Sequence, residues 1–304
     1  MMNKKYSGVV VPMITPFTKN GNVDKSAAQR IAEHLVESGA APFVLGTTGE
    51  LASIPLKQRK SLVKAVAKQT DKRINVYAGI SGCAFSESIE LAKEYFDYGV
   101  DAFVAHVPYY YPLKAELMQS YFATLADQIP APLLIYNIPI TTHMSIPLES
   151  VEILSHHPNI VGLKDSERDE DRLHKSAKKW KHRTDFSLFC GWGAQMATAL
   201  KEGFDGIVPS TGNIIPEKYK AMYDAVLKKN MMQALQLQNE TDTISKVYQK
   251  DRILSQSLPA LKVIMNSIGL CDPYVLSPLL MLDKAEADSI IHDYNEHVEA
   301  FLEV

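Results

Sequence analysis

The sequence predicts an α/β fold, a TIM-type (β/α)8 barrel followed by a C-terminal extension of three helices. Short apolar runs rich in β-branched residues alternate with amphipathic stretches up to about residue 230. Such runs are typical of strands buried on both faces, and the stretches between them provide the crossovers that parallel strands require. A chain of 304 residues is long enough for one barrel of this kind.

Eight segments carry the strand pattern, and eight successive βα units predict closure into a barrel. The predicted strands are residues 9–15, 42–46, 74–80, 102–107, 132–138, 160–166, 186–192 and 206–211.

Helix start and stop signals lie between these runs. Asp24 precedes a helix predicted over 25–38, and Gly39 ends it. Ser86-Glu87-Ser88 opens another run, which Gly99 closes.

The strand pattern stops after residue 230. Residues 231–247, 259–269 and 284–302 predict three further helices, which we expect to pack on the barrel and to mediate assembly. We therefore expect residues 1–230 to form the catalytic barrel and residues 231–304 to form a helical extension packed on it.

The composition is that of a soluble globular protein, with 46% hydrophobic and 22% charged residues. A net charge of −3 gives no basic surface, which argues against nucleic-acid binding. No apolar stretch behind Lys4 and Lys5 suits a signal peptide, and no later run is long enough to span a bilayer. Cys83, Cys190 and Cys271 are widely spaced, as expected of reduced thiols in the core. The protein is expected in the cytoplasm.

Lys164 lies in an apolar run, Ile160 to Ser166, that should enter the barrel core. Burial disfavours the charged form of a lysine and lowers its pKa, and a neutral amine is a nucleophile. The alternative is a lysine at a strand end whose tip reaches water.

Active sites of such barrels lie at the C-terminal ends of the strands, so the other strand ends are informative. The second strand ends in Gly46-Thr47-Thr48-Gly49-Glu50, where hydroxyls and backbone N–H groups at a helix N-terminus would form a cradle for a carboxylate or phosphate. The alternative is a capped turn with Glu50 near the helix start.

Tyrosines follow the fourth and fifth strands. Pro108-Tyr109-Tyr110-Tyr111-Pro112 presents three phenols, which are also common in packing and at interfaces, and Tyr136 precedes a turn at Asn137-Ile138-Pro139. The eighth strand ends in Pro209-Ser210-Thr211-Gly212-Asn213, which either lines a pocket or connects elements. A carboxylate cradle, a phenol and a desolvated lysine at one barrel end indicate an enzyme that forms a Schiff base.

The sequence resembles the pyruvate-dependent class I aldolases, the family that includes dihydrodipicolinate synthase and N-acetylneuraminate lyase. The resemblance covers nearly the whole chain. It is carried, in the family's order, by Thr15-Pro16-Phe17, Gly46-Thr47-Thr48-Gly49-Glu50, Pro108-Tyr109-Tyr110, Tyr136-Asn137-Ile138-Pro139, Gly162-Leu163-Lys164 and Ser210-Thr211-Gly212-Asn213.

The resemblance implies that Lys164 forms the imine and that Tyr136 moves protons, with help from Thr48 and Tyr110. Thr47 and Thr48 would hold the pyruvate carboxylate. Tyr110 would reach the active site of a neighbouring subunit, as expected of a homodimer or homotetramer. No metal or organic cofactor is expected, because the protonated imine is itself the electron sink.

The substrate is less well indicated. Dihydrodipicolinate synthases usually carry an arginine where this chain has Thr141, and a glycine where it has His143. N-acetylneuraminate lyases usually carry acidic residues where this chain has Gly191-Trp192-Gly193-Ala194. Both activities remain open, but a 2-keto-3-deoxy sugar acid is favoured, with a dehydratase using the same imine as a further alternative. The expected substrate-binding residues are Thr47, Thr48, Ser166, Gly191, Val208, Ser210, Thr141 and His143, with His106 as an additional candidate.

Two readings lie outside this class. A metal-dependent aldolase would need about three histidines or carboxylates at one barrel end, and no paired metal spacing is present. A non-catalytic 2-oxo acid binding protein would need the cradle but not both Tyr136 and Lys164. The charge run from Glu167 to Arg172 is expected to be a solvated helix start.

Overall fold

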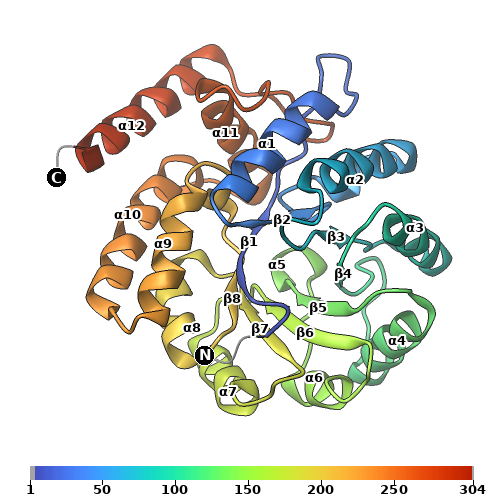
Figure 1. Cartoon of the computed structure of the whole chain (residues 1–304). Coiled ribbons are helices and arrows are strands. Elements are labelled where there is room, and N and C mark those ends of the chain that lie inside the picture. Colours follow the sequence, from blue (N-terminus) through green and yellow to red (C-terminus); the bar gives the residue numbers. More distant parts are fainter. Residues whose placement is uncertain (1–3, 303–304) are drawn as a thin grey trace.

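Parallel strands close into a barrel at the centre of the computed structural model, which describes residues 4–302 (Figure 1). The strands are β1 Gly8–Pro12, β2 Ala41–Val44, β3 Tyr77–Gly79, β4 Ala102–Ala105, β5 Leu133–Asn137, β6 Ile160–Asp165, β7 Ser187–Cys190 and β8 Gly206–Ile207. They pair in sequence order, and β8 pairs with β1. The predicted (β/α)8 fold is confirmed.

Helices surround the strands (Figure 1). Around the barrel they are α1 Lys25–Glu37, α2 Leu56–Thr70, α3 Phe85–Asp97, α4 Ala115–Gln128, α5 Pro139–Thr142, α6 Leu148–Leu154, α7 Glu170–Trp180, α8 Met196–Glu202 and α9 Pro216–Leu227, with short 3-10 helices η1 Leu51–Ser53, η2 Gly193–Gln195 and η3 Ser210–Asn213. The chain continues with α10 Met231–Gln249, α11 Leu254–Ser267 and α12 Lys284–Leu302.

The helix boundaries follow local capping. The Asp24 side chain accepts the N–H of Ala27 at the start of α1, and Gly39 has a φ of 72° just after its end. The prediction that a helix begins at Pro259 was wrong by five positions, because α11 begins at Leu254 and contains the proline. The Gln256 side chain accepts the Ile253 N–H and sets this earlier start.

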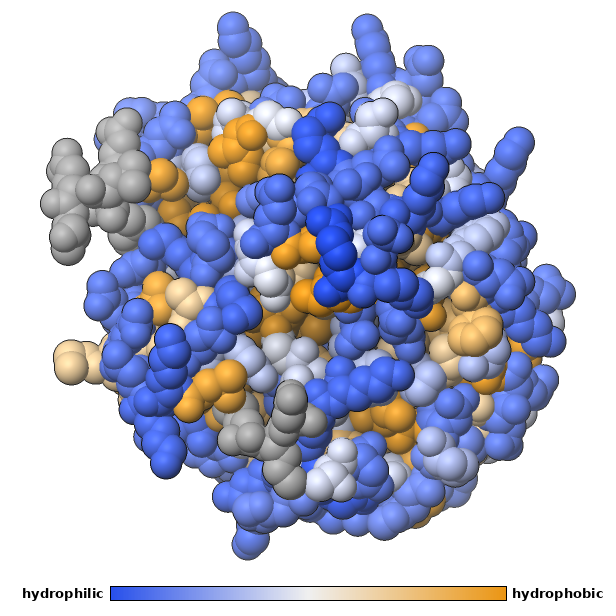
Figure 2. All heavy atoms as spheres, in the orientation of Figure 1, coloured by the Kyte–Doolittle hydropathy of each residue, from blue (hydrophilic) through white to orange (hydrophobic). Residues whose placement is uncertain are grey.

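Two apolar cores hold the barrel together. One lies between the strands and the surrounding helices. The other fills the barrel interior and includes Val10, Phe43, Val104, Tyr136 and Phe189. Side chains on both faces of the strands are therefore buried, as expected of parallel strands covered by helices. Figure 2 shows that one face of the molecule is mainly hydrophilic, with hydrophobic residues in small groups.

The seam between β1 and β8 is fixed by polar contacts at both barrel ends. At the N-terminal end, the Lys4 ammonium lies 2.8 Å from the Asp205 carboxylate and donates to the Phe186 carbonyl at 2.8 Å. At the C-terminal end, the Asn213 side chain donates to the Pro12 carbonyl and accepts the Ile14 N–H. Both ends of the seam are therefore held by buried groups with partners.

The C-terminal helices lie beside the barrel. Helix α10 packs along α9 and α8, while α12 contacts α10 and α11 and lies at the outer edge (Figure 1). The Arg30 side chain of α1 donates to the Leu270 carbonyl just after α11. Within residues 4–302, we find no helix with the length and apolarity needed to cross a membrane.

Candidate active site

Lys164 lies inside the barrel and is only 4% exposed. Its Nζ is 3.7 Å from the ring centroid of Tyr136 and 4.8 Å from that of Phe43. Burial lowers the pKa of Lys164, and its interaction with Tyr136 partly opposes this. The alternative of a lysine tip in water is therefore wrong, and the chain holds a desolvated amine.

Tyr136 lies beside Lys164 on the adjacent strand. The two residues are in register between β5 and β6. The Tyr136 hydroxyl lies 3.5 Å from Thr47 Oγ1. A chain of polar groups thus runs from the amine past the phenol to the loop after β2.

The loop after β2, Gly46–Glu50, is the cradle loop, and anion binding there stays a prediction. The N–H groups of Gly49 and Glu50 donate to the carbonyls of Gly46 and Thr47, both at 3.1 Å, and Thr15 Oγ1 donates to the Gly49 carbonyl at 2.7 Å. The helix predicted to follow it is only η1, because Pro55 intervenes before α2. The N–H groups of Gly49 and Glu50 are therefore used within the loop, and no long helix dipole points at it, so the threonine hydroxyls are the clearer candidate donors for an anion.

The two threonines of the cradle differ. The structure pairs Thr47, not Thr48, with the Tyr136 hydroxyl. Thr48 is buried in the same loop. The Thr47 hydroxyl is thus the one near the phenol, and the assistance of Thr48 to Tyr136 stays a prediction.

The three tyrosines after β4 lie at the surface. Tyr110 is 73% exposed, and its ring packs edge to face on Tyr111 with centroids 5.0 Å apart. Among the described residues, Tyr110 makes no hydrogen bond to Tyr136 or Thr48. Within one chain it is therefore separate from the lysine site.

The ends of β6, β7 and β8 bring three of the expected substrate-binding residues together. Gly191 closely approaches Ser166, since a Cβ on the glycine would lie 2.1 Å from Ser166 Oγ. Val208 is buried in the interior core with Tyr136, and its N–H donates to the Cys190 carbonyl. A side chain at position 191 would displace the Ser166 hydroxyl and crowd the Asp165 carbonyl.

The three other expected substrate-binding residues do not take part in the Ser166–Gly191 contact. They are Ser210, Thr141 and His143. Ser210 Oγ is 2.8 Å from the hydroxyl of Tyr248 on α10, so it is already hydrogen-bonded. Thr141 lies in α5 and is half-buried, with its hydroxyl near the Ile138 carbonyl. His143 ends α5 with a φ of 58° and is exposed.

His106 lies just after β4, and its ring is 6.2 Å from that of Tyr136. Its Nδ1 is 2.8 Å from the Val107 carbonyl, which can only accept, so Nδ1 carries the proton and Nε2 is left as an acceptor. Burial and the charge of Lys164 both lower the pKa of His106, against the Val107 hydrogen bond. A neutral imidazole therefore lies beside the tyrosine.

A buried polar network lies next to Lys164 that the sequence analysis missed. Asp165 accepts from Asn137 Nδ2 at 2.9 Å and from Arg172 Nε at 2.6 Å. The Arg172 side chain is only 10% exposed, so the prediction of a solvated helix start was wrong at this residue. A buried carboxylate needs a hydrogen-bonding or charged partner. The position of Asp165 at the end of an apolar run was the sequence signal that could have predicted such a partner.

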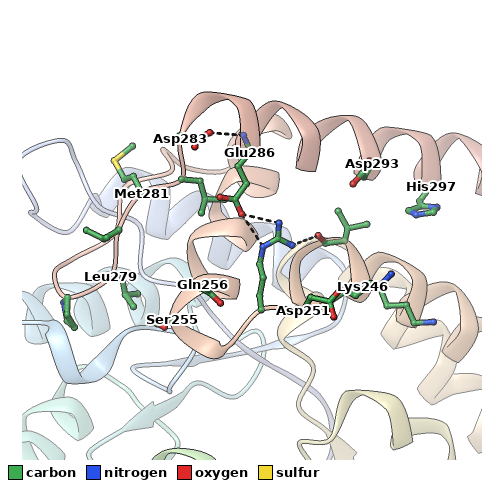
Figure 3. A pocket seen from close by; sticks show the side chains of 16 residues that line it. Lys246, Asp251, Ser255, Gln256, Leu279, Met281, Asp283, Glu286, Asp293 and His297 are labelled. Atoms are coloured by element: carbon green, nitrogen blue, oxygen red, sulfur yellow. Dashed lines mark hydrogen bonds and ion pairs between the residues drawn. The ribbon is translucent and has the colours of Figure 1, made fainter.

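Two further observations concern possible metal ligands and a hollow away from the lysine site. Among residues 4–302, no group of three or more His, Cys, Asp or Glu side chains is arranged to hold a metal ion. A hollow of about 1060 Å³ lies between α10, α11, α12 and the segment before α12, and none of the site residues lines it (Figure 3).

A buried lysine packed on a tyrosine at the C-terminal end of a (β/α)8 barrel is suited to covalent catalysis through an imine. The family model described as "Dihydrodipicolinate synthetase family" matches residues 5–296, and the chain belongs to this family. Its members are pyruvate-dependent class I lyases, and the chain is an enzyme of this class.

Three relatives show the similarity along the whole chain. A 4-hydroxy-tetrahydrodipicolinate synthase of Staphylococcus haemolyticus (strain JCSC1435) is 27% identical over 292 residues, which cover 96% of this chain and 97% of the relative. A probable 2-dehydro-3-deoxy-D-pentonate aldolase of Escherichia coli (strain K12) is 28% identical, over 94% of this chain and 96% of the relative. The solved dihydrodipicolinate synthase of Bacteroides thetaiotaomicron superposes with a TM-score of 0.92 at 30% identity, over 97% of this chain and 100% of that one.

Proposed function

We propose that this protein cleaves a 2-keto-3-deoxy sugar acid to pyruvate and an aldehyde, or catalyses the reverse condensation, through an imine on Lys164. The observation that carries the proposal is the buried Lys164 amine 3.7 Å from the centre of the Tyr136 ring. A lowered pKa gives this lysine a larger neutral fraction than an exposed lysine has at the same pH.

The proposed reaction begins when the Lys164 amine adds to C2 of the 2-keto acid. Water leaves and one proton is taken up from solvent, which gives a protonated imine. As the C4 hydroxyl passes its proton to Tyr136, the phenol releases its own proton through its hydrogen-bonding neighbour Thr47 to solvent. The C3–C4 bond breaks, its electrons enter the imine as an enamine, and the aldehyde leaves. A proton from solvent then adds to C3, and addition of one water releases pyruvate, restores the amine and returns one proton to solvent.

The cradle loop supplies the proposed contacts for the carboxylate of the 2-keto acid. Thr47 and Thr48 offer hydroxyl and backbone donors, and Ser166, Gly191 and Val208 directly follow the C-terminal ends of β6, β7 and β8. This chemistry uses no metal or organic cofactor, because the imine accepts the electron pair.

The sugar-acid substrate is favoured by the residues around the site. Thr141 and His143 provide no guanidinium for a second carboxylate, while Ser166, Thr141 and the neutral His106 suit the hydroxyls of a sugar chain. The alternative of a 4-hydroxy-tetrahydrodipicolinate synthase is supported by a relative at almost the same identity as the E. coli aldolase. The other alternative activities are cleavage of N-acetylneuraminate and a dehydration that uses the same imine. A non-catalytic 2-oxo acid binding protein would not require the packed Tyr136–Lys164 pair.

We further propose a homo-oligomer, a dimer or a tetramer, in which the exposed Tyr110 reaches the site of a neighbouring copy. The three cysteines form no disulfide, which supports a reducing compartment such as the cytoplasm.

The test is pyruvate release from N-acetylneuraminate and a panel of 2-keto-3-deoxy sugar acids, coupled to lactate dehydrogenase, with Lys164→Ala as the blank. Release from a sugar acid that is lost in the blank supports the proposal. Borohydride reduction with pyruvate should add mass to Lys164 alone, and labelling elsewhere would contradict the assignment. Release from no panel member, with Lys164 still labelled, would favour condensation with a semialdehyde or dehydration.

A further inference from the structure

Another buried lysine, Lys262 on α11, forms an ion pair with Glu50, the last residue of the cradle loop. Its Nζ lies 2.5 Å from Glu50 Oε1, and both side chains are 1% exposed. Residues 50 and 262 come from the barrel and from the C-terminal helices, so the pair joins two distant parts of the chain.

The remaining polar atoms of the pair are also occupied. Glu50 Oε2 accepts the Leu276 N–H at 3.1 Å, and Lys262 donates to the Tyr274 carbonyl at 2.8 Å. The Lys262 ammonium lies 4.2 Å from the ring centroid of Phe17. Burial lowers the pKa of Lys262, and Glu50 opposes this by favouring the charged form. The pair is thus held in one geometry by α11, the segment that follows it and the loop after β1.

A buried ion pair is weak support for stability, because apolar side chains of similar size are often as good. Separating the two groups would leave an uncompensated buried charge, so each group resists displacement from its partner. Glu50 has a φ of 57° and donates its N–H to the Thr47 carbonyl at 3.1 Å. Any displacement of Glu50 therefore moves the peptide that carries Thr47, whose hydroxyl faces Tyr136.

We propose that the Glu50–Lys262 pair positions Thr47 and Thr48 to bind the carboxylate of the 2-oxo acid. The C-terminal helices are then part of the active-site architecture, in addition to any role in assembly. Glu50 and Lys262 are positioning residues, because they act through the loop and touch neither the substrate nor Lys164. This inference rests on the proposed function.

The experiment measures how borohydride labelling of Lys164 depends on pyruvate concentration, in the whole protein and in Glu50→Gln, Lys262→Met and the double variant. The double variant leaves neither charge unpaired, so it is the one to use if a single variant fails to fold. Asp205→Asn is the matched control, because it disrupts another buried lysine–carboxylate pair, Lys4–Asp205, at the opposite end of the barrel.

We expect the pyruvate concentration for half-maximal labelling to rise about tenfold or more in the Glu50 and Lys262 variants, since small displacements of positioning groups have large effects. Labelling at saturating pyruvate should remain. Asp205→Asn should lower the melting temperature without changing the half-maximal concentration.

A purely structural role predicts a different pattern. If the Glu50 and Lys262 variants melt earlier but are half-labelled at the wild-type pyruvate concentration, the inference is overturned while the proposed function stands. If wild-type Lys164 is not labelled at all, the proposed function itself fails.

Discussion

At the scale of single residues, the protonation of Lys164 governs the proposed chemistry. Burial lowers its pKa, so the neutral amine should be present at lower pH than for a lysine in water. We expect the rate of pyruvate labelling to rise with pH, with a midpoint below about 10.4, the ordinary pKa of a lysine side chain. Mass spectrometry of the Lys164 peptide across a pH series measures this midpoint. A midpoint at the ordinary value would show that burial does not activate Lys164.

The same burial should weaken the fold. The folded protein binds fewer protons at Lys164 than the unfolded chain between the lowered pKa and about 10.4, so this contribution to stability falls as the pH drops through that window. Lys164→Met should therefore melt about 2–4 °C higher near neutral pH while losing all labelling. The difference should shrink above pH about 10.4, where both states are neutral. Calorimetry at two pH values checks this, and an earlier melting variant at neutral pH would refute it.

Tyr136 should matter for bond cleavage and not for imine formation. Tyr136→Phe keeps the ring packed on Lys164 and removes the hydroxyl near Thr47. We expect turnover to fall about 10²- to 10⁴-fold, the usual contribution of a proton-transfer group, with pyruvate labelling largely kept. Single-turnover kinetics separate the two steps. A variant that loses labelling in parallel with turnover would assign Tyr136 to imine formation.

The sequence identified Lys164 and Tyr136 because a polar group inside an apolar run requires an explanation. It did not distinguish Thr47 from Thr48, since the backbone angles of the turn, including the positive φ of Leu45 and Glu50, decide which hydroxyl faces the phenol. It also misjudged Arg172, because a run of charges does not reveal that one of them has a buried partner.

At the scale of elements, β2 and β3 support the cradle through a close backbone contact. A Cβ on Gly79 would lie 1.9 Å from the Leu45 carbonyl oxygen, next to the start of the cradle loop. Gly79→Ala should cost about 3 kcal/mol, at the upper end for overpacking, because backbone cannot easily yield.

Gly193→Ala is the control for this change, since nothing lies within 4 Å of a Cβ at that position. It should change the unfolding free energy by less than about 0.5 kcal/mol. Urea unfolding of both variants measures the contrast. Similar losses in the two would mean that the Leu45 contact relaxes at little cost.

The strands were predictable as elements because each is an apolar run with turn signals on either side. Their ends were not: the segment expected as strand up to residue 211 is β8 only to Ile207, followed by η3. After β8, the Asn213 side chain is hydrogen-bonded to Pro12 and Ile14, which are far away in the sequence, and a local pattern does not reveal such contacts.

At the scale of the whole molecule, the exposed Tyr110 leads to a prediction about assembly. If it completes a neighbouring site, Lys164→Ala and Tyr110→Phe subunits should complement each other. An equal mixture refolded together should regain up to about one quarter of the wild-type activity, because half of the dimers are mixed and each holds one intact site. Activity no higher than that of the separate variants would place Tyr110 outside any shared site.

The contacts at the seam also determine when the site can form. Lys4 and Asp205 are 201 positions apart, and so are Asn213 and Pro12. During synthesis, β1 emerges first and remains an unpaired sheet edge until β8 has been made, because nothing earlier in the chain can close the ring. A chain that stalls before residue 206 therefore presents an open edge suited to pairing with another chain, although Lys164 and Tyr136 have already been synthesised.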